Sequence, residues 1–129
     1  MSKKNRTTKE HFMIFQEEAR YWIERFGLKN WRISFRHEHQ EQEAFASYGY
    51  NIHGHTIILN LEPDWEDIEV TEAQLRRSAF HEVRHIILCR LRALAMARQI
   101  TEGDIDEEIH NIIRIDENAV WEPERGDKQ

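Results

Sequence analysis

Five consecutive residues in the second half of the chain have the types and the spacing of a zinc-binding helix. They read His81-Glu82-Val83-Arg84-His85, an H-E-x-x-H pentapeptide. Residues four apart lie on one face of an α-helix, so both imidazoles could bind the same zinc ion. Glu82 points about 100° away from His81 around the helix and is free to act as a general base. The pentapeptide predicts zinc as the cofactor, and a solvated polar helix face is the alternative.

The residues around the pentapeptide predict a helix that is buried except at the histidines. Thr71 and Gln74 form a capping box that opens a helix running to about Gln99. Apolar residues cover most of the circumference of this helix: Phe80, Val83, Ile86, Ile87, Leu88, Cys89, Leu91, Leu94 and Ala95. The polar gap falls at the two histidines and Glu82, which favours a cleft over an exposed surface.

The rest of the pattern predicts one domain of α+β class over residues 1–129. A first helix opens at a capping box of Thr7 and Glu10 and ends at Gly27. A last, glutamate-bearing helix opens at a capping box of Asp104 and Glu107 and is closed by Pro123. Between the first helix and the long active-site helix, a small three-stranded sheet is expected from residues 31–36, 44–51 and 55–61. Mobile tails are expected at about residues 1–6 and 122–129.

The third zinc ligand is expected from the last helix. A catalytic zinc site has three protein ligands and leaves the fourth position to water. Glu108 lies at the flank of the apolar face of this helix, whereas Glu107 lies nearly opposite, so we expect Glu108 to be the ligand. Asp116 falls in the middle of the apolar face. It either orients a ligand histidine through the other ring nitrogen or bonds to backbone or an arginine, and both interpretations stay open.

This combination of residues and elements resembles the gluzincin metallopeptidases, over residues 8–121. It looks like their smallest members, the minigluzincins, which implies a minimal zincin-like fold, and it is similar to SprT-like and phage-encoded metallopeptidases. The resemblance implies His81, His85 and Glu108 as zinc ligands and Glu82 as the catalytic residue. The chain differs from larger members in having no evident C-terminal domain that supplies a transition-state-stabilising His or Tyr. It also lacks the zinc-ribbon cysteines of some SprT-like proteins.

Other polar residues are candidates for supporting roles. Tyr48 and Tyr50, on a predicted strand beside the cleft, either stabilise the transition state as hydrogen-bond donors or pack as ordinary aromatic residues. Arg77, Arg84 and Arg92 fall near the histidine side of the helix, where they either hold a substrate carboxylate or serve as solubilising charge.

Two further histidine pairs have the i, i+2 spacing of one strand face. His37 with His39 and His53 with His55 could form a second metal site. Each pair lies next to a run of alternating apolar residues, which favours strand ends that emerge from the core into water.

Composition narrows the class of protein. The chain is 40% hydrophobic and 33% charged, its net charge is −6, and its single cysteine, Cys89, cannot form an internal disulfide. The basic start is not followed by an apolar segment, and no run is long enough to span a membrane, so we expect a cytoplasmic protein. The negative charge argues against general nucleic-acid affinity.

These observations together predict a zinc-dependent peptidase with a peptide or protein substrate and no membrane partner. Zinc on His81, His85 and Glu108 would activate water, and Glu82 would take its proton and protonate the leaving amine. The alternative is a non-hydrolytic zinc-binding protein with a zincin fold that serves a partner-binding or DNA-associated regulatory role.

Overall fold

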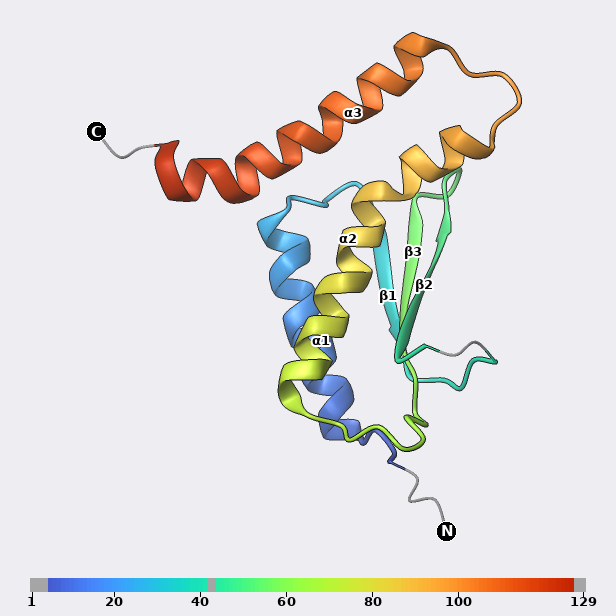
Figure 1. The fold of residues 1–129 in the computed structure, drawn as a ribbon, viewed down its shortest axis with the longest axis vertical. Helices are drawn as coiled ribbons and strands as arrows, with labels where there is room; N and C mark the ends of the chain where they lie inside the picture. Colours follow the sequence, from blue (N-terminus) through green and yellow to red (C-terminus); the bar gives the residue numbers. More distant parts are fainter. Residues whose placement is uncertain (1–4, 42–43, 127–129) are drawn as a thin grey trace.

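The structure is a computed structural model that describes residues 5–41 and 44–126. Three α-helices, a π-helix that continues the last of them and a small mixed sheet form the described part, which confirms the predicted α+β class and the order of the elements (Figure 1). None of the helices in the described ranges is long and apolar enough to cross a membrane. The elements are α1 (Lys9–Arg25), β1 (Arg32–Arg36), β2 (Ala46–Asn51), β3 (Thr56–Leu61), α2 (Glu72–Met96), α3 (Glu102–Asp116) and the π-helix η1 (Glu117–Gly126).

The sheet has β3 at its centre, with β1 parallel to it on one side and β2 antiparallel on the other. Ile57 in β3 stands opposite Ile33 of β1 and Tyr50 of β2. Alternating β3 residues, Ile57, Leu59 and Leu61, are fully buried, as expected for a strand with one face on the core. Among the described strands, this order leaves one edge of β2 without a partner.

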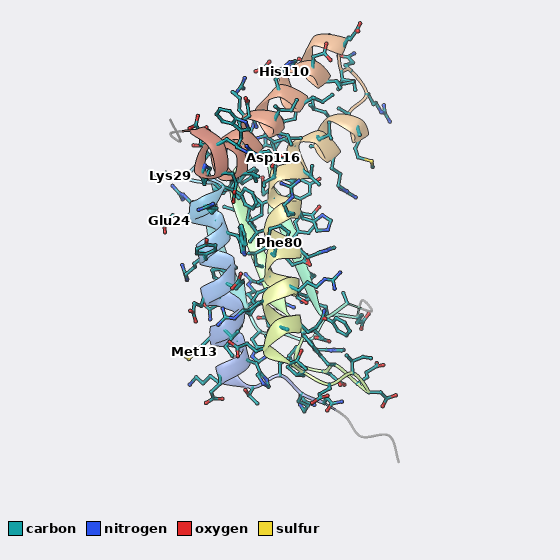
Figure 2. The ribbon with its side chains drawn as sticks, turned by 60° about the vertical axis from the view of Figure 1, so that its left-hand side comes forward. Met13, Glu24, Lys29, Phe80, His110 and Asp116 are labelled. Carbon is teal, nitrogen blue, oxygen red and sulfur yellow. The ribbon has the colours of Figure 1, made fainter. Side chains whose placement is uncertain are left out.

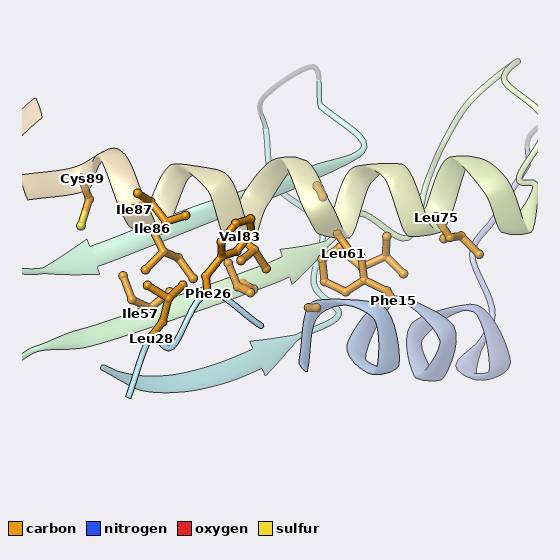
Figure 3. Close-up of a cluster of buried hydrophobic side chains, with 14 of the residues drawn as sticks. Phe15, Phe26, Leu28, Ile57, Leu61, Leu75, Val83, Ile86, Ile87 and Cys89 are labelled. Atoms are coloured by element: carbon orange, nitrogen blue, oxygen red, sulfur yellow. The ribbon is translucent and has the colours of Figure 1, made fainter. Parts of the chain in front are cut away.

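The core lies where α1, α2 and the sheet meet. Helices α1 and α2 lie side by side, and the sheet packs against them (Figure 1). Figure 3 shows Phe15 of α1, Leu61 of β3 and both Leu75 and Val83 of α2 converging between these elements, and all four side chains are fully buried. The apolar face of α2 is therefore buried in the core, and this burial fixes the rotation of the helix about its axis.

Helices α1 and α3 begin at other residues than the sequence pattern predicts, whereas α2 begins at the predicted residue. The N-cap of α1 is Thr8, whose hydroxyl accepts from the His11 N–H, and not Thr7. Thr7 is engaged in a tertiary contact, because its hydroxyl donates to the Glu62 carbonyl. For α2, the predicted cap at Thr71 is confirmed, although the helix ends at Met96 rather than near Gln99.

Helix α3 also begins earlier than predicted. Thr101 is its N-cap and forms a reciprocal capping box with Asp104, so the predicted box of Asp104 with Glu107 was wrong. Asp104 is the third helical residue, where a short acidic side chain can reach back to the cap N–H. Glu107 lies one turn further on and is exposed.

The C-terminal helix continues past the predicted stop. The π-helix η1 runs from Glu117 to Gly126 with Pro123 inside it, so Pro123 does not end the helix. The wider π-helical turn, with its i to i+5 pairing, is an alternative to the α-helical pattern that proline interrupts. Of the two expected tails, residues 1–4 and 127–129 lie outside the described residues, whereas the Asn5 N–H donates to the Glu66 carbonyl at 2.7 Å and residues 122–126 are helical.

Helix α3 is held much less firmly than α2. It has no buried residue, and Ile109 and Ile113 are 40% and 46% exposed. The following η1 is anchored by the buried Ala119, whose carbonyl accepts from Arg25 of α1 at 3.0 Å.

We therefore expect the backbone amides of α3 to exchange with solvent faster than those of α2. Opening α3 exposes little apolar surface, so its local unfolding costs little free energy. Hydrogen–deuterium exchange with mass spectrometry on peptides from residues 76–95 and 103–115 checks this. Equal protection of the two segments would contradict it.

Candidate metal centre

The two histidines of the pentapeptide lie one turn apart near the middle of α2, as the sequence predicts. Their Nε2 atoms are 3.2 Å apart, and their ring centroids are separated by 4.9 Å. Two imidazole nitrogens that bind one tetrahedral zinc, each at 2.0–2.1 Å, would lie roughly 3.3 Å apart. The spacing of His81 and His85 therefore fits two ligand positions of a single zinc ion.

Glu82 lies at the border between the open side of α2 and the core. Its side chain is buried, with 6% exposure, and it lines a cavity of about 220 Å³ together with His81 and the segment 44–46 that leads into β2. Burial raises the pKa of the Glu82 carboxyl from 4.5 to about 7, because the charged form is poorly solvated there. A carboxyl with this pKa can both accept and release a proton near neutral pH.

The β2 strand supplies an aromatic wall on the other side of the histidines. The ring of Tyr48 stacks on His85, with centroids 4.5 Å apart and planes 13° apart. Burial lowers the pKa of His85, and the neighbouring His81 lowers it further, so the ring favours the neutral form that binds a metal. Burial also raises the pKa of the Tyr48 phenol, which keeps this hydroxyl protonated and able to donate.

Tyr50 lies one step further along the same strand face. Its ring stacks with Tyr48, and its hydroxyl accepts from the Arg92 guanidinium at 3.0 Å. Of the two tyrosines considered as transition-state stabilisers, Tyr48 is thus the one in contact with a candidate ligand.

The structure does not bring the expected third ligand to the histidines. Within the described ranges, no group of three or more His, Cys, Asp or Glu side chains is placed to hold a metal ion. Glu108 is half-buried, while its neighbour Glu107 is exposed. The hydrogen bond of the Glu108 carboxylate is to the Asn111 amide at 3.5 Å. The residues present thus fit two of the three protein positions of a catalytic zinc site.

Asp116 contacts an arginine rather than a histidine. Its carboxylate accepts from Arg84 of α2 at 3.1 Å, and Figure 2 shows it near the crossing of the C-terminal helices with α2. This contact corresponds to the second of the two roles that the sequence left open. Of the three arginines considered from the sequence, Arg84 contacts Asp116 and Arg92 contacts Tyr50, whereas Arg77 lines the cavity together with His81 and Glu82.

The other histidine pairs lie at strand ends. His37 follows β1, contacts the Thr7 hydroxyl at 2.6 Å and stacks on Phe12. His39 pairs with the buried Glu62. His53 and His55 are exposed in the turn between β2 and β3.

Some residues of the cavity were not recognised from the sequence. Ser78 and Gln74 line it, and both precede His81 on the same side of α2, at i−3 and i−7. Their helical spacing from the histidine could have identified them. Ala44 and Phe45 also line it, but they reach the site through the path of the chain before β2, for which the sequence carries no local signal.

Comparison with known proteins identifies no relative: no protein-family model, no curated protein and no solved structure matches the chain. The geometry and chemistry of the residues therefore have to carry the functional argument.

The burial of Glu82 should make the metal-free protein less stable as the pH rises. The raised carboxyl pKa means that the folded state binds the proton more tightly than the unfolded chain. The contribution of Glu82 to stability is then fully present below pH 4.5 and is lost as the pH rises through about 7. Glu82→Gln, which cannot ionise, should raise the unfolding free energy at pH 8 by up to about 3 kcal/mol and have little effect near pH 5.

Denaturant unfolding at the two pH values, with a chelator present, measures this difference. Glu24→Gln is the matched control, because Glu24 is exposed on α1 (Figure 2). An equal effect of both substitutions at pH 8 would show that Glu82 is not desolvated in the folded protein.

Proposed function

We propose that the protein is a zinc-dependent peptidase of the gluzincin type that hydrolyses a peptide bond. One observation carries the proposal: the paired Nε2 atoms of His81 and His85 lie beside a buried carboxylate that lines a cavity. When bound, zinc would supply Lewis-acid chemistry by acidifying water and polarising a carbonyl group. His81 and His85 would hold it, and Glu108 is the proposed third ligand.

Glu82 is the proposed general base and acid. Its carboxylate would accept a proton from the attacking water as the bond from the water oxygen to the carbonyl carbon forms. It would then donate this proton to the amine nitrogen as the carbon–nitrogen bond breaks. The pKa of about 7 supports both steps near neutral pH.

The edge strand β2 is the proposed binding site for the substrate backbone. An extended peptide that adds to this edge would run past the cavity that contains His81 and Glu82. Tyr48, in contact with His85, would donate a hydrogen bond to the oxygen of the attacked carbonyl.

A second candidate function follows from the incomplete ligand set. Among the described residues no third His, Cys, Asp or Glu side chain is placed to bind a metal together with the histidine pair, which favours a zinc-binding protein without hydrolytic activity. Such a protein would use the metal for stability or for binding a partner.

Zinc binding should depend on Glu108 and not on Glu107. The first is half-buried and the second is exposed, so only Glu108 is turned towards the rest of the protein. We expect one zinc per chain, and Glu108→Gln should weaken binding on the order of tenfold or more, whereas Glu107→Gln should leave it unchanged. Titration of untagged protein against a chromophoric chelator measures both. Equal affinities for the two variants would exclude Glu108 as a ligand, and an absence of zinc binding by the wild type would exclude the proposed function.

Activity should depend on the proton-transfer role of Glu82. Glu82→Gln keeps the size of the side chain but cannot carry a proton, so zinc content should be retained while peptide hydrolysis falls by a factor on the order of 10²–10⁴. His81→Gln, the control, should lose both. A Glu82→Gln protein that cleaves a peptide library at the wild-type rate would rule out the mechanism. A zinc-loaded wild type that cleaves none of it would favour the non-hydrolytic candidate.

A further inference from the structure

The C-terminal helices border a large apolar cavity away from the histidine pair. Helices α3 and η1, residues 102–126, form an arm that runs back from the end of α2 past the end of α1 (Figure 1). The cavity has a volume of about 770 Å³. Phe26 of α1 and Phe80 of α2 line it, together with Ile113, Val120 and Trp121 of the arm. We call this cavity the apolar groove.

The apolar side chains that the arm contributes are exposed. Val120 and Trp121 are 56% and 54% exposed, and no residue of α3 is buried. Ile109 lies one helical turn before Ile113 and is exposed as well, so the apolar strip continues along α3 beyond the groove. An exposed apolar patch of this kind marks a surface that another molecule covers. Its extension along a helix favours an elongated partner over a compact ligand.

The arm carries the negative charge of the protein. Nine of its residues are Asp or Glu and two are Arg, which gives it a net charge of −7, whereas the whole chain has −6. Within the lining of the groove, Asp116 pairs with Arg84 at 3.1 Å, and Arg125 is the second cation. Glu117 and Glu124 also line the groove, are exposed and form no ion pair with any described residue. The groove thus combines an apolar surface with exposed carboxylates.

This charge selects among the possible occupants. A second copy of the chain that docked through the same face would bring a second arm of −7 against the first. An anionic membrane or a nucleic acid would be repelled in the same way. A helix with one apolar and one basic face, by contrast, matches both the apolar strip and the carboxylates.

We propose that the apolar groove binds a basic amphipathic helix of a partner protein. Apolar side chains of the partner at i, i+3, i+4 and i+7 enter the groove, and its lysine or arginine side chains pair with Glu117 and Glu124. The proposal concerns a different surface from the candidate metal centre and does not depend on peptidase activity.

The wall of the groove on the α2 side is formed before any partner binds. The Phe80 ring packs edge-on against Trp22, with centroids 4.8 Å apart, and lies 6.2 Å from the ring of Phe26. The Arg84 guanidinium lies 5.6 Å from the centre of the Phe26 ring. The partner therefore meets a packed aromatic wall on one side and the weakly held arm on the other, which can adjust to it.

Three synthetic peptides test the charge and the shape of the expected partner. The first has two repeats of Leu-Lys-Lys-Leu-Leu-Lys-Leu, which place the leucines on one face of a helix. The second has glutamate in place of lysine. The third has the composition of the first with leucine and lysine alternating, which leaves no single apolar helix face. In titrations followed by fluorescence anisotropy of the labelled peptides, the first should bind at least about tenfold more tightly than either of the others at low salt. Its advantage over the glutamate peptide should shrink in about 0.5 M salt.

Variants of exposed apolar residues locate the binding in the groove. Val120→Ser combined with Trp121→Ser removes two side chains of the lining and should weaken binding of the first peptide about tenfold or more. Met13→Ser combined with Met96→Ser removes two exposed apolar side chains from other surfaces and should leave the affinity unchanged. Because all four residues are exposed, folding should be retained, and circular dichroism verifies this.

Variants of exposed carboxylates test the charge without changing the apolar surface. Glu117→Gln combined with Glu124→Gln should weaken binding of the first peptide about threefold to tenfold and reduce its salt dependence. Glu10→Gln combined with Glu69→Gln removes the same charge from other surfaces and should have a smaller effect.

The outcomes decide between the occupants. Equal binding of the three peptides, no binding of the first, or losses that are the same in the groove variants and in their controls would overturn the proposal. Light scattering of the wild type adds an outcome: a dimer that Val120→Ser with Trp121→Ser makes monomeric would show that a second copy occupies the groove, which also overturns it. Selective binding of the first peptide by a protein that binds no zinc and cleaves no peptide would support the groove while the proposed peptidase function fails.

Discussion

Helix α2 is packed on two sides at once, against α1 and against the sheet, and the candidate site depends on this double burial. Residues such as Leu75, Val83 and Ile86 fill the core and fix the rotation of the helix. One strip along the helix remains open, and the histidine pair lies on it. Glu82, about 100° around the axis, then falls at the border of the core. The desolvation of this carboxyl is a direct consequence of helical geometry.

Helical periodicity was the strongest signal in the sequence, and its limits are visible at the helix ends. The pattern correctly predicts α2, its cap at Thr71 and the common face of His81 and His85. At the start of α1, two adjacent threonines are equally suitable as caps. The choice of Thr8 depends on the carbonyl of Glu62, far away in the chain, which engages Thr7. Local pattern carries no information on such a contact.

The same reasoning explains why the third ligand could not be located from the sequence. Periodicity fixes the direction of a side chain around a helix, and Glu108 is indeed less exposed than Glu107. Periodicity does not fix the position of one helix along the axis of another. That position follows from tertiary contacts, such as the pairing of Asp116 with Arg84 of α2. The order of the strands was equally hidden, because β1 pairs with β3 rather than with its neighbour in the chain.

This strand order also affects how the chain assembles. The strands β2 and β3 form a hairpin of segments that are neighbours in the sequence. In contrast, β1 pairs with β3 although the whole of β2 lies between them in the sequence, as the pairing of Ile33 with Ile57 shows. Contacts between distant segments form more slowly than local ones. During synthesis from the N-terminus, α1 and β1 emerge before either of their main partners, α2 and β3. Their apolar residues, Phe15 among them, stay uncovered until the second half of the chain has been made, which makes the nascent N-terminal half the part most exposed to aggregation.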